Sequence, residues 1–446
     1  MTGIISMPTP AQEPDGPSAW PGATQGLITT VLLALASMGS QFDRTVVNLT
    51  VGPLKATFSL DDTHFAMLQG MAFGIFYITA CIPIGALADR YQRRLIIATG
   101  LGFFSLFAVG SGLARNYLQL FLTRIGVAVG EATLTPAGLS MLSDLYPPNR
   151  LGRPVSAFLM SAPVGQGLAF IIGGKLLYWL TNSPAVALGP LSHLAPWQNA
   201  FIIVGAPFLL LVPLFLLQRE PKRHGPGGDL PLTVPQVLEV VRSRSRALIP
   251  MFAGFAMVSL VSYTFFIWTP AFMQRTYGWD TGRIGVAFGL ITLVCGTGGV
   301  FFAGWLSDRL ASRGKLDAHL RVAAYGFIGC GFFGALALLM PTATAALAML
   351  APAIFLSMMP YPCAGTAIQL VVPNRARAQL TAMYVTLTTL VGLVVGPLIV
   401  GLMTDRVFHD PAQIRYSLAI VVGIAAPTMF VLLLSAFRPY RALRVS

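Results

Sequence analysis

The segment Leu120–Arg153, LFLTRIGVAVGEATLTPAGLSMLSDLYPPNRLGR, decides how the rest of the sequence is interpreted. Its first two-thirds is apolar and long enough to cross a bilayer, yet it contains Arg124 and Glu131. These residues are seven positions apart, so their side chains lie on one face of a helix, about 10 Å apart along its axis. Because an ionised side chain at the centre of a membrane helix costs about 3 kcal/mol, the two residues indicate a polar cavity that is shared with other spans.

The composition places the whole chain in the membrane. Of its 446 residues, 55% are hydrophobic and only 10% are charged, which is too little charge to cover a soluble protein of this size. Apolar runs of about 20 residues, the length that crosses a bilayer, recur along the sequence. We therefore predict an all-α polytopic membrane protein with twelve transmembrane helices.

The basic residues follow a topology rule. The net charge is +13, but the Lys and Arg residues lie in short loops and do not form one patch, so nucleic acid is not expected as a partner. Of the 29, 20 fall in the two tails and in alternate loops, six in the opposite loops and three within spans. The positive-inside rule then predicts that both termini are cytoplasmic. No targeting segment is recognised, and an integral, multi-pass protein of the plasma (inner) membrane is expected.

The spans divide into two sets of six. The expected regions are a disordered cytoplasmic tail at 1–23, an N-terminal six-helix bundle at 24–217, a cytoplasmic linker with an amphipathic helix at 218–246, a C-terminal six-helix bundle at 247–437 and a cytoplasmic tail at 438–446. The linker is rich in Pro and Gly at first and then basic, which is typical of a segment that lies on the membrane surface.

The two halves carry an internal repeat. Asp89-Arg90 recurs as Asp308-Arg309, 219 positions later, and Pro148-Asn149-Arg150 recurs as Pro373-Asn374-Arg375, 225 positions later. Two independent markers with nearly the same offset predict two pseudo-symmetric halves. Parallel repeats of six spans are the architecture of secondary transporters that alternate around a central cavity.

Three motifs carry a resemblance to a known family. GALADRYQRR (Gly85–Arg94) resembles the signature of the major facilitator superfamily, with Gln92 where Gly is usual. Phe42-Asp43-Arg44 and the segment Arg124–Ala132 resemble the Spinster subfamily of lysolipid and sphingolipid transporters. The resemblance implies the major facilitator fold, transport by alternating access and an amphiphilic lipid-like substrate.

Proton coupling is expected from the acidic residues that lie deepest in the spans, Asp43 and Glu131. The predicted spans place Asp43 at the same depth as Arg124, and a nearby cation favours the ionised carboxylate. Glu131 lies about two turns deeper without an obvious neighbour, so it is the expected site of proton uptake and release. Arg44 and Arg124 are the expected contacts of a substrate head group. The alternative is a static ion pair that fixes helix packing, with Arg44 merely extending toward the membrane surface.

A cytoplasmic gate is expected at the inner ends of span 2 (about 64–88), span 4 (about 117–143) and span 8 (about 283–306). The candidate residues are Asp89, Arg90, Arg93, Arg94, Asp144, Asp308 and Arg309. We expect Arg90 to pair with Asp144 when the cavity opens outward, mainly because of the family resemblance. The alternative is that these cations only anchor the inner loops, which is the expected role of Arg93 and Arg94.

No buried acid is expected in the second half, whose spans offer apolar and aromatic residues instead. Candidate cavity residues, for each of which packing or lipid contact is the alternative, are Gln69, Tyr263, Trp268, Met358, Tyr361 and Tyr384. Together with a charged first half, such a surface suits an amphiphile, because methionine and aromatic side chains adapt to flexible apolar ligands.

The functional hypothesis is a proton-coupled secondary transporter of a lysophospholipid or sphingoid-like amphiphile, acting as a monomer. A drug/proton antiporter that exports hydrophobic cations is the alternative within transport, and a non-transporting membrane scaffold is an alternative of another class. The sequence contains no ATP-binding P-loop, metal-ligand cluster or hydrolase nucleophile motif. The protein is therefore not expected to be an enzyme or to need a cofactor, and its expected partners are the lipid-like substrate, protons and membrane lipids.

Overall fold

A computed structural model describes most of the chain. The described residues are 20–147, 149–183, 192–223 and 233–445. The predicted N-terminal tail lies almost entirely outside them, as does part of the predicted linker.

The described chain is helical throughout its spans, as the apolar runs predict. The first half and the linker contain α1 (Ala23–Leu49), α2 (Val51–Phe58), α3 (Asp62–Ala66), η1 (Met67–Ile75), α4 (Phe76–Arg90), α5 (Arg93–Gly112), α6 (Tyr117–Glu131), α7 (Leu134–Leu145), α8 (Gly152–Asn182), α9 (Pro196–Gly205), η3 (Ala206–Leu210), α10 (Leu211–Leu217) and α11 (Val234–Ser243). The second half contains α12 (Ser245–Tyr277), α13 (Thr281–Ile291), η4 (Thr292–Gly296), α14 (Thr297–Ser312), α15 (Ala318–Leu339), α16 (Ala343–Met358), α17 (Pro360–Val371), η5 (Asn374–Ala376), α18 (Arg377–Leu390), η6 (Val391–Val395), α19 (Gly396–Leu402), η7 (Met403–Phe408), η8 (Pro411–Gln413) and α20 (Ile414–Val445).

Eleven helical stretches in the described residues are long and apolar enough to cross a membrane. Helix α1 is the twelfth: it has 27 residues, and Gln41, Asp43 and Arg44 lie within it. At about 1.5 Å per residue it exceeds the hydrocarbon thickness of about 30 Å. The twelve-helix prediction is thus consistent with the structure.

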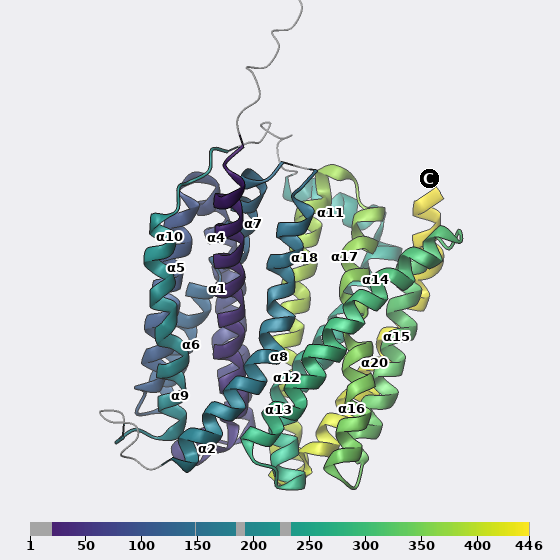
Figure 1. Ribbon diagram of the computed structural model, residues 1–446. Helices are drawn as coiled ribbons and strands as arrows, with labels where there is room; N and C mark the ends of the chain where they lie inside the picture. Colours follow the sequence, from purple (N-terminus) through teal and green to yellow (C-terminus); the bar gives the residue numbers. More distant parts are fainter. Residues whose placement is uncertain (1–19, 148, 184–191, 224–232, 446) are drawn as a thin grey trace, which may run out of the picture.

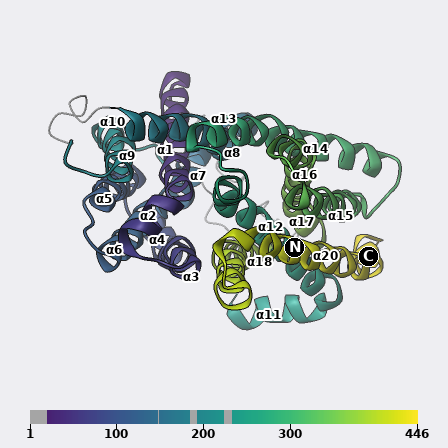
Figure 2. The ribbon, with the colours of Figure 1, turned by 90° about the horizontal axis from the view of Figure 1, so that it is seen from below.

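The two halves lie side by side (Figure 1, Figure 2). Figure 1 places the start of α1, the linker helix α11 and the end of α20 at the same end of the molecule, which we call the tail end. Helix α2 and the turn between α12 and α13 lie at the other end, which we call the far end.

The halves touch closely where α8 crosses α13. A Cβ atom on Gly285 would lie 2.3 Å from the carbonyl oxygen of Phe170 and 2.8 Å from Cα of Gly174. Only glycine permits this approach of the two backbones, as in other membrane helix pairs. Next to it, the rings of Phe170 and Phe288 meet edge to face at 4.9 Å between centroids.

The internal repeat extends to the irregularities of the helices. A π-helical segment begins at Met67 in span 2 and another begins at Thr292 in span 8, 225 positions later. This equals the offset of the Pro-Asn-Arg repeat. Single π-helical turns within α-helices are frequently found at functional sites.

Candidate functional site

Two ion pairs join α1 to α6 inside the first half of the bundle. Asp43 and Arg44 are consecutive on α1, whereas Arg124 and Glu131 are two turns apart on α6. Asp43 pairs with Arg124, and Arg44 pairs with Glu131. Each pair is built from one residue of each helix, so movement of α1 against α6 strains both pairs together.

The Asp43–Arg124 pair is bidentate and sealed from solvent. Nη1 of Arg124 donates to Oδ2 of Asp43 at 2.7 Å, and Nη2 donates to Oδ1 at 3.0 Å and to Oγ of Ser111 at 3.2 Å. Both charged side chains are 1% exposed, and the guanidinium lies 5.3 Å from the ring centroid of Phe201. The expected proximity of these two residues is therefore observed, and in this conformation Arg124 has almost no surface to offer to a substrate.

Glu131 has a partner that the sequence did not predict. Nη2 of Arg44 donates to its Oε1 at 2.5 Å, and Nε donates to Oε2 at 3.3 Å. The expectation of an acid without a neighbour is wrong, because the Arg44 side chain reaches across to α6 instead of extending toward the membrane surface. Arg44 remains 17% exposed and lies over the ring of Phe73, 4.3 Å from its centroid.

Close packing behind α6 fixes the position of this acid. A Cβ atom on Gly130, the residue before Glu131, would lie 2.5 Å from the backbone nitrogen of Phe104 on α5. The helices can approach this closely because position 130 has no side chain. Glu131 is thereby held against α1, where only 6% of its side chain is exposed.

A short polar chain connects this site to the second half. Gln69 donates from Nε2 to the carbonyl oxygen of Arg44 at 3.3 Å and to the side-chain oxygen of Asn48. Asn48 in turn donates to the carbonyl oxygen of Phe266 on α12, at 3.2 Å. Gln69 is 5% exposed, so here it links η1 to α1, and Asn48 makes the bond to the second half.

The far end of the molecule is closed by a charged cluster that the sequence analysis missed. Asp62, whose side chain is fully buried, accepts two hydrogen bonds of 2.7 Å from Arg275 of the second half and a further one from Lys55. A signal was available, since Lys55 and Arg275 belong to the few cations of the outer loops. Cations on that side are unusual and therefore call for an acidic partner.

Asp405 of the second half also binds the first half at this cluster. Its carboxylate accepts from the backbone nitrogens of Asp62 and Thr63, at 3.2 and 2.6 Å, and from the hydroxyl of Thr63 at 2.6 Å. The neighbouring Asp61 caps α3; burial tends to raise its pKa, but hydrogen bonds from the backbone and side chain of His64 lower the pKa overall. In the part of the chain that the structure describes, the hydrogen bonds between the two halves all lie toward this far end.

At the tail end, Asp144 pairs with Arg93 and not with Arg90. Arg93 is 1% exposed and pairs with Asp144 at the end of α7 and, from Nε at 2.9 Å, with Glu220 at the start of the linker. Arg93 therefore does more than the loop anchoring that the positive-inside rule predicts for it. The backbone nitrogens of Arg93 and Arg94 also donate to Glu220, at 3.1 and 3.0 Å, so one carboxylate fastens the linker to the first turn of α5.

Among the other candidate gate residues, Arg94 is half-buried and donates to the carbonyl oxygen of Gln218, and the remaining four are exposed. Asp89 and Arg90 end α4, and Asp308 and Arg309 lie near the end of α14. Arg309 rests on the ring of Trp305, 5.2 Å from its centroid. The two repeated Asp-Arg pairs thus occupy equivalent, exposed positions in this conformation.

The candidate cavity residues differ in their access to solvent. Tyr361 is 37% exposed, and Tyr263 and Tyr384 are partly buried. Met358 is buried, and Trp268 has no exposed surface because its indole packs on Phe65 and donates to the carbonyl oxygen of Pro397 at 3.2 Å. The three tyrosines therefore remain candidates for substrate contact, whereas in this conformation Trp268 is a packing residue between the halves.

Comparison with known proteins identifies the family. A family model described as Major Facilitator Superfamily matches residues 33–397. The chain is 28% identical over 416 residues to an MFS-type efflux pump of Mycolicibacterium smegmatis, covering 89% of this chain and 88% of that protein. It is also 28% identical over 418 residues to protein spinster homolog 1 of Mus musculus, covering 86% of this chain and 74% of that protein.

A solved structure shares the fold along nearly the whole chain. It is that of a bacterial homolog of the human lysosomal transporter Spinster, in an inward-facing and unoccupied conformation. The TM-score is 0.75 at 24% sequence identity, and the match covers 95% of this chain and 97% of the other. The Spinster-like resemblance predicted from the sequence is confirmed.

Proposed function

The chain belongs to the major facilitator superfamily, and we propose that it is a proton-coupled secondary transporter that moves a lysophospholipid or sphingoid-like amphiphile by alternating access. Its family makes it an integral, multi-pass membrane transporter and not an enzyme. The observation that carries the proposal is the double ion pair between α1 and α6. Four ionisable side chains are costly within a membrane-spanning bundle and are typical of ion pathways there.

Arg44 is the residue that would link the proton to the substrate. Its guanidinium is paired with Glu131 and is 17% exposed, whereas Arg124 is 1% exposed and donates two hydrogen bonds to Asp43. When Glu131 accepts a proton it becomes neutral, and its attraction for Arg44 falls. Arg44 stays positively charged and can then bind the anionic group of a substrate, so that proton uptake and head-group binding favour each other.

The apolar part of the substrate would lie against aromatic side chains. Arg44 already rests on Phe73, and the ring of Tyr77 is 5.6 Å from the guanidinium. The exposed Tyr361 and the partly buried Tyr263 and Tyr384 supply further surface from the second half. A charged contact beside an aromatic wall suits an amphiphile with an anionic head.

The far-end cluster of Asp62, Arg275 and Asp405 would be the closed gate of this conformation. It joins the two halves by hydrogen bonds and ion pairs at the far end. The tail end carries most of the loop cations, which by the positive-inside rule makes it the cytoplasmic end in a plasma membrane. The conformation is then open toward the cytoplasm.

A drug/proton antiporter is the second candidate function. The observation that favours it is the similarity to an efflux pump over 89% of this chain. The two candidates differ in the charge of the substrate. An exporter of hydrophobic cations needs a carboxylate that can bind the cation, whereas here each deep acid is paired with an arginine.

Transport in proteoliposomes separates these functions. We expect a labelled anionic lysophospholipid to be transported by the wild type and a lipophilic cation to compete poorly. Arg44→Gln should raise the KM for the lysophospholipid, and Arg44→Lys should restore part of the affinity because it keeps the charge. Transport of the lipophilic cation in preference to the lysophospholipid, unaffected by Arg44→Gln, would contradict the proposal.

A further inference from the structure

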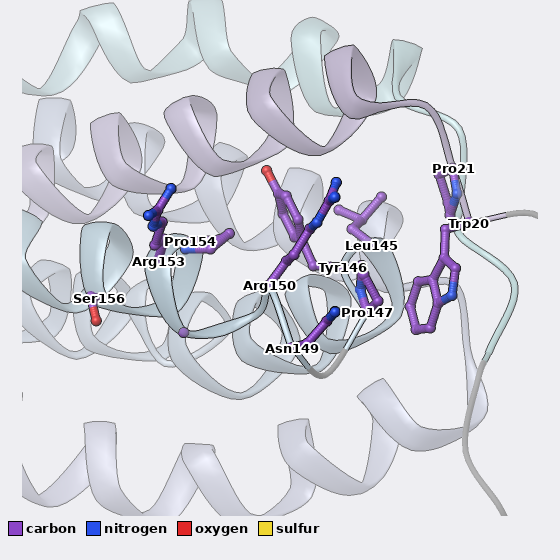
Figure 3. Close-up of a pocket in the computed structure, with 11 residues that line it drawn as sticks. Trp20, Pro21, Leu145, Tyr146, Pro147, Asn149, Arg150, Arg153, Pro154 and Ser156 are labelled. Carbon is purple, nitrogen blue, oxygen red and sulfur yellow. The ribbon is translucent and has the colours of Figure 1, made fainter.

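A cavity of about 1200 Å³ lies at the tail end, outside the site described above (Figure 3). It is formed where α7 ends and α8 begins, beside the residues that precede α1. Leu145 is the last residue of one apolar span and Gly152 the first of the next. The cavity thus lies at the level where membrane spans meet the head-group layer of a bilayer.

The lining of the cavity is positively charged. Arg150 and Arg153 both line it, and none of the lining residues that the structure describes is acidic. Within the described residues, neither guanidinium forms an ion pair or a side-chain hydrogen bond. The acid at the nearby end of α7, Asp144, is engaged by Arg93. Two cations that face a cavity with no acid in its described lining attract a phosphate or another anionic group with several acceptor oxygens.

An aromatic and apolar wall faces these cations. Trp20 and Tyr146 line the cavity together with Leu145, Pro147 and Pro154. Tyr146 is fixed in place, since its hydroxyl lies 3.1 Å from that of Thr30 and its ring packs against Gly26 of α1. Trp and Tyr side chains prefer the membrane–water interface, so the wall suits the glycerol and first acyl carbons of a lipid.

We propose that this cavity binds the phosphate head group of an anionic membrane lipid, with Arg150 and Arg153 on the phosphate and Trp20 and Tyr146 on the glycerol region. Basic pockets between spans on the cytoplasmic side of a membrane protein recognise anionic lipids in this way. The site is separate from Arg44 and Glu131. It therefore does not depend on the identity of the transported substrate.

The test compares the binding of two phospholipids that have the same acyl chains and different head groups. The full-length protein is used, in neutral detergent. Dioctanoyl-phosphatidylglycerol should bind and dioctanoyl-phosphatidylcholine should bind much more weakly, as measured by native mass spectrometry and by quenching of the Trp20-dependent fluorescence. Arg150→Gln with Arg153→Gln should lower the affinity for phosphatidylglycerol by about 30-fold. The matched control is Arg313→Gln with Lys315→Gln, which removes the same charge from an exposed loop elsewhere and should leave binding unchanged.

Three results would overturn the proposal. They are equal binding of the two lipids by the wild type, unchanged affinity in the Arg150/Arg153 variant while the protein keeps its thermal unfolding midpoint, and binding of inorganic phosphate as tight and as arginine-dependent as that of phosphatidylglycerol. The last result would identify a free-anion site. Trp20→Phe identifies the part of the fluorescence change that comes from Trp20, because it removes one of the six tryptophans and no charge.

Discussion

At the scale of single residues, the two deep carboxylates have different surroundings although both are paired. Asp43 accepts two hydrogen bonds from an arginine that is as buried as itself, and both side chains are 1% exposed. Glu131 is paired with an arginine that keeps 17% of its surface exposed. We infer that Asp43 maintains the geometry of α1 on α6 and that Glu131 is the acid that exchanges protons.

Substitution of these acids should have unequal effects on stability. Asp43→Asn leaves the guanidinium of Arg124 buried without a carboxylate, which is expected to lower the free energy of unfolding by about 3–5 kcal/mol. Glu131→Gln should cost clearly less, because Arg44 can turn its exposed part to water and still rest on Phe73. Thermal unfolding in detergent measures both. Equal losses of stability would argue against the division of roles between the two pairs.

At the scale of elements, the far-end cluster holds α3 against the end of α12 and against η7. Asp62→Asn removes the carboxylate that Arg275 and Lys55 share, so the two halves should separate more often at this end. Spin labels on the exposed residues Ala56 and Ala412 report this by pulsed electron paramagnetic resonance, and we expect a new population at longer distance.

A matched control comes from the same end of the molecule. Asp280 is exposed and caps α13, and among the described residues it forms no hydrogen bond or ion pair with the first half, so Asp280→Asn should leave the distance distribution as in the wild type. If Asp62→Asn also leaves it unchanged, the cluster is not a gate.

A second element-scale contact fastens the linker to the first turn of α5. Glu220→Gln weakens the acceptor of the hydrogen bonds from the Arg93 and Arg94 backbone nitrogens. The hydrogens of these two amides should therefore exchange with deuterium about tenfold faster, which corresponds to a loss of about 1.4 kcal/mol in the free energy of local opening. Glu239→Gln, an exposed acid of the linker helix α11, is the control and should exchange as the wild type does. Equal exchange in all three proteins would mean that Glu220 does not hold the linker.

Sequence reasoning recovered the elements well and their contacts only in part. Span number and the internal repeat depend on local hydropathy and on short motifs, which the sequence contains directly. The Asp43–Arg124 pair followed from equal depth in the membrane. Other pairings depend on how the helices rotate about their axes and on which loops meet, and the hydrophobic periodicity of one sequence does not contain that information. They are the pairings of Arg44 with Glu131, of Arg93 with Asp144 and Glu220, and of Asp62 with Arg275.

At the scale of the whole molecule, the connections between the halves are concentrated at one end. Charged and polar bonds join them near Asp62, and glycines let α8 and α13 touch. We propose that α1–α10 and α12–α20 move as two bodies about this contact, so that the site around Arg44 faces one side of the membrane at a time. The protonation of Glu131 would bias which side it faces.

The central claim is that Glu131 couples transport to protons, and gradient-driven transport in proteoliposomes tests it most directly. A pH gradient imposed across the membrane should drive the wild type to accumulate a labelled anionic lysophospholipid. Glu131→Gln should still exchange labelled for unlabelled substrate, which shows that it is folded and binds, but its transport should no longer respond to the gradient. Accumulation by Glu131→Gln that follows the pH gradient as in the wild type would contradict the account.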